Sequence, residues 1–216
     1  MKIEFIAHAT FMVTLSDGRR LIIDPYQGMA FQGRFNYPPC VADVDFALIT
    51  HEHVDHNYTS DLHPTPVIVR HGWQDDRLRI TSVFVWHDKV QGTRFGGGVL
   101  AKIIEADGLR ICHLGDCGEI LSDAQISRFG KLDLLILPVG GFYTLDGDDA
   151  AALVRRMSAR TIFPCHYKTS LCSLPIEPVD RFLSHFHHVT SLEHAIFDVS
   201  ALPKGVVVSP GRFTHD

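Results

Sequence analysis

Apolar residues in the first half of the chain occur in short runs separated by turn residues, which predicts β-strands. The first runs cover residues 3–6, 11–15 and 21–23 and predict a β-meander. The meander ends at Asp24-Pro25, because proline has no amide hydrogen to continue the ladder. A loop rich in glycine, proline and aromatic residues is expected over residues 26–43. Further strands are expected over residues 45–50, 66–70, 79–86, 97–106 and 109–114, the last two joined by the hairpin turn Asp107-Gly108.

Helical patterns occur in the second half, where they alternate with strands. Ser122 can cap a helix that ends at Gly130. A helix over residues 148–157 begins with aspartates and ends near arginines, which suits the helix dipole. Two sheets packed face to face with helices outside would bury such elements, and we expect a single domain over residues 1–216. The pattern also predicts a helix over 178–188 and strands over 134–138, 161–164 and 205–209.

The composition is that of an ordinary globular chain. Its 216 residues, 45% hydrophobic and 21% charged, suffice for one large core. No apolar stretch is long enough to cross a bilayer, and the N-terminus lacks the pattern of a secretion signal. The five cysteines are an odd number without a Cys-x-x-Cys pair. We therefore expect a reduced, cytoplasmic protein.

The charge pattern bears on possible partners. The formal net charge is −5, and no stripe of lysine and arginine is long enough to follow phosphates. We expect a small-molecule substrate, with no nucleic acid and no membrane as partner. A homo-oligomer is possible, and the aromatic loop 25–43 could form a wall of the pocket or an oligomer contact.

The heptapeptide at residues 50–56, Thr-His-Glu-His-Val-Asp-His, carries the strongest chemical signal, directly after an apolar run. His51 and His53 are two residues apart, so on an extended backbone they point the same way. Asp55 and His56 are adjacent and diverge unless the chain turns. One nitrogen pair and one oxygen–nitrogen pair are what two neighbouring metal ions need. The alternative is a polar loop with this pattern by coincidence.

Three more residues with metal-binding side chains follow the ends of predicted strands. His87 follows the strand over 79–86, Asp116 follows the strand over 109–114, and His166 follows the strand over 161–164. A sheet delivers such side chains to a shared edge, so these residues are candidate ligands beside the heptapeptide.

These motifs resemble those of the metallo-β-lactamase superfamily. Its hallmark is His-x-His-x-Asp-His, followed by a histidine, a Gly-Asp pair and a late histidine. Within the superfamily, the chain resembles small metal-dependent hydrolases similar to L-ascorbate-6-phosphate lactonase. The segments that carry this finer resemblance are residues 7–11, 22–25, 113–116, 138–141 and 164–169.

The resemblance implies a four-layer αβ/βα sandwich with two metal sites at one edge between the sheets. Departures from the family pattern are Ala7, where glycine is common, and Cys117 after the Gly-Asp pair, whose role stays open. Zinc is the metal expected first, with manganese or iron as alternatives. The implied ligands are His51, His53 and His87 for the first ion, Asp55, His56 and His166 for the second, and Asp116 as a bridge.

Two divalent ions that share a water lower its pKa, which favours hydrolysis of a small-molecule ester, lactone or phosphoester. The expected catalytic residues are Asp55, Asp116 and His8, the last as a proton donor or as a residue that lines the site; a histidine bonded only to backbone is the alternative. Asp24 could orient a ligand histidine or only form a turn. Superfamily members with a redox di-iron centre carry a motif like His-x-Glu-x-Asp, with a carboxylate in place of the second histidine. This chain has His53 at that position, which favours hydrolysis over redox chemistry.

Two rival functions remain open. One is a phosphodiesterase or nuclease with the same ions, and the other is a metal-binding protein without catalysis. Candidate substrate contacts are Lys89, Arg94, Tyr167 and Lys168, although loops carry such residues without function as well. His113 is expected to pack or to support the site. The late histidines His185, His187, His188 and His194 are expected at the surface or in the core, with adventitious metal binding on one helical face as the alternative for His185 and His188.

Overall fold

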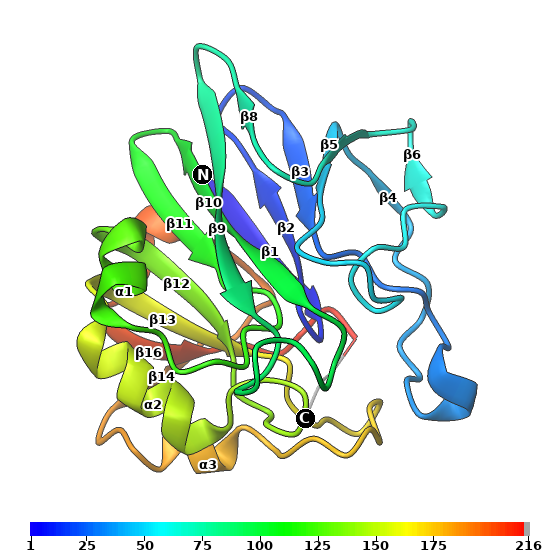
Figure 1. The fold of residues 1–216 in the computed structure, drawn as a ribbon. Helices are drawn as coiled ribbons and strands as arrows, with labels where there is room; N and C mark the ends of the chain where they lie inside the picture. The colour runs from blue at the N-terminus through cyan, green and yellow to red at the C-terminus, as the bar shows by residue number, and fades with distance from the viewer. Residues whose placement is uncertain (214–216) are drawn as a thin grey trace.

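The computed structural model describes residues 1–213, which form two large β-sheets packed face to face (Figure 1). The six-stranded sheet contains the predicted meander, and its β3 and β5 run parallel. Its strands, in spatial order, are β15 (Ile196–Asp198), β1 (Lys2–Ala7), β2 (Thr10–Thr14), β3 (Arg20–Ile23), β5 (Phe46–Leu48) and β7 (Val67–Val69).

The eight-stranded sheet holds the rest of the chain. Its hairpin of β10 and β11 turns at Asp107-Gly108, where the sequence predicted, β9 pairs antiparallel with β10, and the later strands pair in parallel, as expected where helices connect them. Its strands, in spatial order, are β14 (Val189–Ser191), β16 (Gly205–Val208), β13 (Ala159–Cys165), β12 (Leu132–Pro138), β11 (Leu109–His113), β10 (Gly98–Ala106), β9 (Leu78–Trp86) and β8 (Trp73–Gln74).

Alternating side chains of both sheets build the core between them. Phe11 and Val13 of β2 pack against Leu134 of β12 in this inner layer. Met12 and Leu135 lie on the opposite faces of their strands and join other clusters. Strands with both faces buried explain why the sequence shows apolar runs rather than strict alternation.

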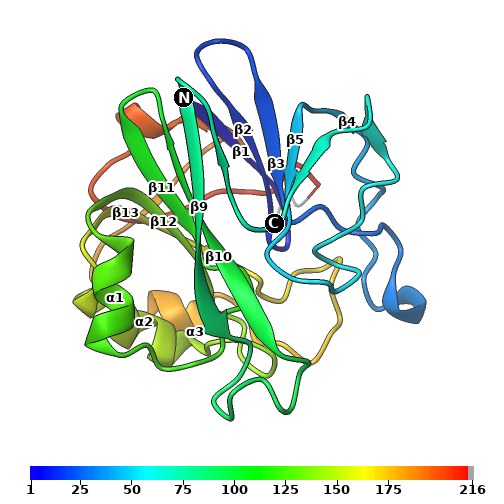
Figure 2. The ribbon, with the colours of Figure 1, turned by 45° about the horizontal axis from the view of Figure 1, so that its top comes forward.

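Helices cover the outer face of the eight-stranded sheet (Figure 2). Helix α1 (Asp123–Phe129) begins with a capping box formed by Ser122 and Gln125. The first turn of α2 (Gly147–Arg156) is capped by the carboxylate of Asp146, two residues before the start of the helix that the sequence predicted. Helix α3 (Asp180–Leu183) is a single short segment.

A loop, rather than a helix, covers the outer face of the six-stranded sheet. Tyr26, Phe35 and Tyr37 of this loop are fully buried against Met12 and Ile22. The loop also contains a short 3-10 helix, η1 (Phe31–Gly33), and one strand of the two-stranded sheet β4 (Ala42–Asp43) with β6 (Leu62–His63). The predicted α/β sandwich of two face-to-face sheets is confirmed, but on this side a loop takes the place of the helices that the αβ/βα arrangement implies.

The prediction of a long helix over residues 178–188 was wrong. The helix ends at Leu183, and the chain turns into β14 at Val189. Phe182 is buried and Phe186 packs on it, but His187, His188 and the β-branched residues after them favour an extended backbone. The short strands β4, β6, β8, β14 and β15 and the 3-10 helix η2 (Val199–Ala201) were also missed. Within residues 1–213, no helix combines the length and apolarity that crossing a bilayer requires.

Candidate metal centre

The ends of five strands, drawn from both sheets, bring the predicted site residues together. His8 directly follows β1, and the 50–56 heptapeptide follows β5. His87 directly follows β9, Asp116 lies three residues after β11, and His166 directly follows β13. All seven predicted ligands belong to two groups of donor atoms in which the atoms lie within 4.8 Å of one another.

The first group consists of His51, His53, His87 and Asp116. The Nε2 atom of His51 lies 3.0 Å from Nδ1 of His53. The same Nδ1 lies 3.3 Å from Nε2 of His87. The Oδ2 atom of Asp116 is 3.4 Å from Nε2 of His87 and 3.7 Å from Nε2 of His51. Three imidazoles and one carboxylate thus converge on one point.

These separations match a tetrahedral cation site. Zinc–nitrogen bonds of about 2.0–2.1 Å at tetrahedral angles place two ligand nitrogens roughly 3.3 Å apart. Two facing imidazole nitrogens without a shared ion would need a proton between them at such a distance. The first group therefore has the donor types and the spacing that a borderline-soft divalent ion requires.

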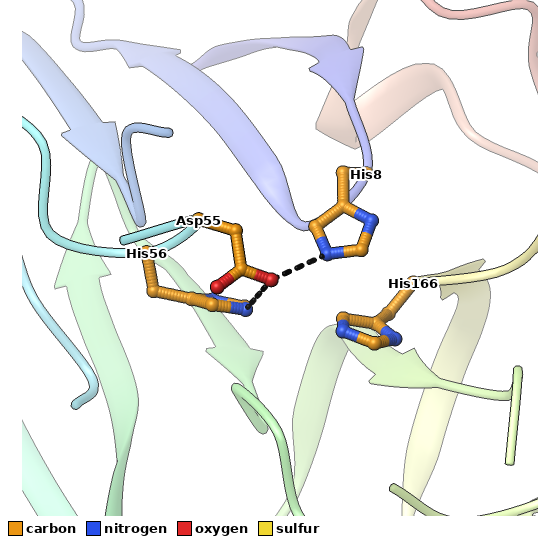
Figure 3. A group of neighbouring side chains, drawn as sticks. All are labelled: His8, Asp55, His56 and His166. Atoms are coloured by element: carbon orange, nitrogen blue, oxygen red, sulfur yellow. Dashed lines mark hydrogen bonds and ion pairs between the residues drawn. The ribbon is translucent and has the colours of Figure 1, made fainter. Parts of the chain in front are cut away.

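The second group consists of His8, Asp55, His56 and His166, all labelled in Figure 3. In this view Asp55 lies between His56 and His8, and its Oδ2 is 3.5 Å from Nε2 of His56 and 3.2 Å from Nε2 of His8. Asp116 also contacts this group, because its Oδ2 is 3.2 Å from Nε2 of His56 and 3.3 Å from Nε2 of His166. A single carboxylate oxygen thus faces imidazoles of both groups.

Unsatisfied buried atoms support a cation at this place. Nε2 of His56 and Oδ1 of Asp116 are buried and form no hydrogen bond among residues 1–213. Unpaired buried polar atoms are costly and rare, so each needs an explanation. A bound ion would satisfy both, and the donor set of nitrogen and carboxylate oxygen fits zinc, manganese or ferrous iron.

The protonation states also suit metal binding. Burial, reinforced by the neighbouring His56, lowers the pKa of His51 to about 3, so its imidazole is neutral at pH 7. Burial opposes ionisation of Asp116, but His166 and His56 hold the pKa of that carboxyl well below its usual range. Burial also opposes charge on His56, yet Asp116 and Asp55 hold its pKa well above the usual range. The carboxylates therefore attract positive charge to this point, which a metal ion can supply.

Asp24 holds the heptapeptide in place through hydrogen bonds to Thr50 and a contact with His56. It is fully buried, and it accepts hydrogen bonds from the backbone amide of Thr50 (2.8 Å) and from its hydroxyl (2.6 Å). Its Oδ2 also lies 3.0 Å from Nδ1 of His56. This contact leaves Nε2 of His56 directed toward Asp116, which is the role that the sequence predicted for Asp24. Asp24 also lies close enough to His51 and His56 to form a third group of possible metal ligands. Its oxygens already contact Thr50 and His56, so we assign it a supporting role rather than a ligand role.

Sequence reasoning missed two further supports. The Thr50 hydroxyl lies 3.0 Å from Nδ1 of His51, and the carbonyl of Tyr143 lies 3.0 Å from Nδ1 of His87. Each contact fixes the orientation of an imidazole ring. Thr50 was detectable as the first residue of the heptapeptide, but a backbone carbonyl carries no signal in the sequence.

Three residues at the centre adopt a left-handed backbone, with φ of 56° for His8, 46° for Asp24 and 51° for His166. Such angles are uncommon for residues other than glycine and collect at functional sites. The His166 amide donates to the carbonyl of His8 (2.8 Å), which ties the two turns together. Strain in both turns thus aims the rings of His8 and His166 at each other, with 4.0 Å between their centroids.

A cavity of about 470 Å³ opens beside both donor groups. Its lining includes Phe31 and Arg34 from the long loop and Arg94 and Phe95 from the loop after His87. Of the predicted substrate contacts, only Arg94 lines it. Lys89 forms an ion pair with Asp149 instead.

Tyr167 and Lys168 line a different cavity, of about 590 Å³. Within the loop over residues 25–43, Phe31 forms part of the wall of the cavity at the metal centre, whereas Tyr26, Phe35 and Tyr37 belong to the core.

Other candidates from the sequence are placed outside the centre. Cys117 is buried in the helix-side core, and burial raises its pKa to about 12, so its thiol stays protonated. His113 lies 2.8 Å from the carbonyl of Ala9, and its Nδ1 accepts from the Gly115 amide, which steadies the turn before Asp116. His185 and His188 do not share a helix, because α3 ends before them, and His185 contacts Asp148.

Known proteins are similar to this chain in sequence. A UPF0173 metal-dependent hydrolase from Thermococcus onnurineus is 29% identical over 196 residues, which cover 78% of this chain and 85% of that protein. Another from Pyrococcus abyssi is 28% identical over 196 residues with the same coverage. These relatives are named metal-dependent hydrolases, which agrees with the predicted enzyme class. The finer resemblance to the lactonase stays a prediction.

Solved structures agree with the sequence comparisons. A protein from Thermotoga maritima, assigned as a Zn-dependent hydrolase of the metallo-β-lactamase superfamily, has a TM-score of 0.74 and 26% identity, and the match covers 97% of this chain and 99% of that one. Igni18, a metallo hydrolase from Ignicoccus hospitalis, shares the fold with a TM-score of 0.66 and 20% identity over 98% of this chain and 96% of that one.

The family profile described as the β-lactamase superfamily domain matches residues 2–166, which include every residue of the two donor groups. The chain therefore belongs to the metallo-β-lactamase superfamily.

Proposed function

We propose that this chain is a hydrolase with a dinuclear metal centre that acts on a small-molecule ester, lactone or phosphoester. The observation that carries the proposal is the position of Asp116. Its Oδ2 lies 3.2–3.7 Å from imidazole nitrogens of His51, His56, His87 and His166, which belong to both donor groups. A carboxylate oxygen shared in this way is a natural bridge between two ions.

The ligand sets are those that the family resemblance implies, and the members of each set lie within one of the two donor groups. His51, His53 and His87 would hold the first ion, and Asp55, His56 and His166 would hold the second. Two such ions would supply a water of lowered pKa and polarise the oxygen under attack. Zinc suits this mixture of imidazole and carboxylate, and manganese or ferrous iron are compatible with it.

The protein's own residues prepare the site for that chemistry. Asp116 and Asp55 hold negative charge where the ions bind, and the neutral ring of His51 offers its lone pair. His8 lies 3.2 Å from Oδ2 of Asp55, so it orients that carboxylate at the edge of the cavity. We assign to His8 the transfer of a proton during bond cleavage, because its imidazole is the one in the second group without an assigned ligand role.

The remaining expectations belong to the same proposal: one domain, a cytoplasmic location and a small-molecule substrate without nucleic acid or membrane. The closest rival is a phosphodiesterase that uses the same ions. An extended basic path would favour it, but many of the basic side chains pair with carboxylates, as Arg70 does with Glu52 and Arg181 with Asp148.

The experiment combines metal analysis with a substrate panel. Elemental analysis of the purified protein gives the identity and number of ions per chain, and two are expected. The panel compares neutral esters, lactones, phosphomonoesters and phosphodiesters on the zinc-loaded protein. Turnover confined to phosphodiesters would favour the rival, and a single ion per chain after loading would refute the dinuclear centre.

A further inference from the structure

Two arginines line the cavity beside the metal centre without a carboxylate partner. Arg34 and Arg94 both contribute to its wall, and within residues 1–213 neither forms an ion pair. Nearby cations differ in this respect, because Lys89 pairs with Asp149 and Arg70 pairs with Glu52. The two guanidinium groups therefore keep their hydrogen-bond donors available to a ligand.

Arg94 belongs to a loop that is built to hold its position. The carboxylate of Asp88 accepts hydrogen bonds from four backbone amides of this loop, including those of Arg94 (2.9 Å) and Phe95 (3.1 Å). The loop also packs on the first donor group, because a Cβ atom at Gly96 would lie 3.6 Å from Nε2 of His53. The backbone of Arg94 is thus fixed beside the metal centre.

Aromatic rings position the side chain of Arg94. Its guanidinium carbon lies 4.8 Å from the ring centroid of Phe95 and 5.5 Å from that of Phe142. Cation–π contacts of this kind hold the planar group while its edge stays free to donate. An arginine held in this way loses less conformational freedom when it binds an anion than a lysine on a free chain does.

Arg34 approaches the cavity from the side of the second donor group. It follows η1, and its carbonyl accepts from the amide of Ser173, in the segment after His166 (2.8 Å). The guanidinium makes one long hydrogen bond, 3.5 Å from Nε to the carbonyl of Phe31. Arg34 and Arg94 thus come from separate segments of the chain that meet at the same cavity.

Apolar groups form much of the remaining wall. Phe31, Phe95 and Leu174 line the cavity together with the arginines and the metal centre's histidines and carboxylates. A ligand that fits must therefore offer an apolar body together with a group that a guanidinium binds. Carboxylate and phosphate both match the fork of donors on arginine.

We propose that Arg94, assisted by Arg34, binds an anionic group of the substrate, so that the cavity selects small organic anions with a carboxylate or phosphate on an apolar body. This inference rests on the proposed hydrolase function. It makes Arg94 a specificity-determining residue, separate from the groups that bind the metal ions.

The test uses substrates that differ in one charge. Mono-4-nitrophenyl glutarate ends in a carboxylate, 4-nitrophenyl pentanoate ends in a methyl group, and a third ester carries a terminal phosphate. On the zinc-loaded protein, kcat/KM should favour the anionic esters by about tenfold, as charge-assisted hydrogen bonds at a partly exposed site allow. The carboxylate and phosphate arms show which anion is preferred.

Variants assign that preference to the arginines. Arg94→Ala should remove most of it, so that the ratio of kcat/KM for the anionic esters to kcat/KM for the neutral ester falls toward one, and Arg94→Lys should restore part of that ratio. Arg34→Ala should have a smaller effect of the same kind. Arg128→Ala is the matched control, because Arg128 is an exposed arginine at the end of α1 that does not line the cavity.

A binding measurement separates this inference from the reaction. The 4-nitroanilides of glutaric and pentanoic acid resist hydrolysis, and calorimetry gives their affinities for the wild type and for each variant. Tighter binding of the glutaric anilide that depends on Arg94 supports the inference, even if no ester is hydrolysed and the proposed reaction fails. The inference would be overturned if the wild type bound the charged and neutral anilides with equal affinity. It would also be overturned if Arg94→Ala kept the wild-type difference in affinity between them.

Discussion

Asp24→Asn tests whether a supporting carboxylate controls the metal centre. The substitution keeps the size of the side chain but replaces one acceptor oxygen with an amide that donates. The remaining oxygen stays where the Thr50 amide donates to it, so the new NH2 group faces the Thr50 hydroxyl and Nδ1 of His56. His56 must then offer a lone pair at Nδ1 and carry its proton on Nε2, the atom directed toward Asp116.

The size of the effect follows from this change of tautomer. A protonated Nε2 cannot bind a cation. Metal binding at the second donor group therefore requires His56 to move its proton back to Nδ1, where the N–H would face the amide hydrogens of the introduced asparagine. Loss of such a support typically weakens metal binding by about 10- to 100-fold. That factor corresponds to roughly 1.4–2.8 kcal/mol of binding free energy. Binding at the first group should weaken by a smaller factor, because Asp24 acts on it only through the Thr50 hydroxyl, which bonds to Asp24 and lies 3.0 Å from Nδ1 of His51.

The assay is a zinc titration in competition with a chromophoric chelator. The wild type should show two tight equivalents, and Asp24→Asn should show both weakened, the equivalent at the second group by the larger factor. Asp133→Asn is the control, because Asp133 accepts from the Arg110 amide (2.8 Å) away from the centre. Near-ultraviolet circular dichroism verifies that each variant is folded. A folded Asp24→Asn protein that takes up both equivalents with wild-type affinity would refute the role assigned to Asp24.

Three other predictions concern the bridge, the loop and the core. Asp116→Ala should lower kcat/KM by roughly 100-fold or more, since both donor groups lose a ligand, and retained activity with full metal content would contradict the bridging role. Asp88→Ala should speed hydrogen exchange of the Val90, Gly92, Arg94 and Phe95 amides, and unchanged exchange would show that other contacts hold that loop. Burial lowers the pKa of Lys102 to about 8, so the unfolded chain binds more protons between that pH and the usual lysine pKa. The free energy of unfolding should therefore rise by up to about 3 kcal/mol across that interval, and Lys102→Met, compared by urea unfolding at roughly pH 7 and pH 10, should lack the rise.

Local patterns in the sequence were sufficient to predict most of the sheet strands. The β9–β10 and β10–β11 hairpins and the parallel strands after them have long apolar runs bounded by clear turns. The helix predicted over 178–188 failed because its helical spacing was satisfied by the one turn that buries Phe182. Short strands such as β4 and β15 are set by pairing with distant segments, which no local pattern reveals.

The metal centre was more predictable than the cavity beside it. Its seven candidate ligands follow strand ends, and strand ends that meet at one edge of a sandwich bring them together. The orientation of His87 depends on the carbonyl of Tyr143, 56 residues away, which no side-chain motif could indicate. Arg34 was missed for a similar reason, because only the folded loop places it beside Arg94 at the cavity.

The long loop on the six-stranded sheet contains residues buried in the core and residues that are exposed or line the cavity. Tyr26, Phe35 and Tyr37 anchor it in the interior, while Met29 is 61% exposed and Phe31 and Arg34 reach the cavity. A library that randomises residues 31–34 and spares the buried Ala30 would therefore leave the anchors and the ligand-bearing strands intact. This short tip is the natural place to engineer a new substrate preference into the protein without unfolding it.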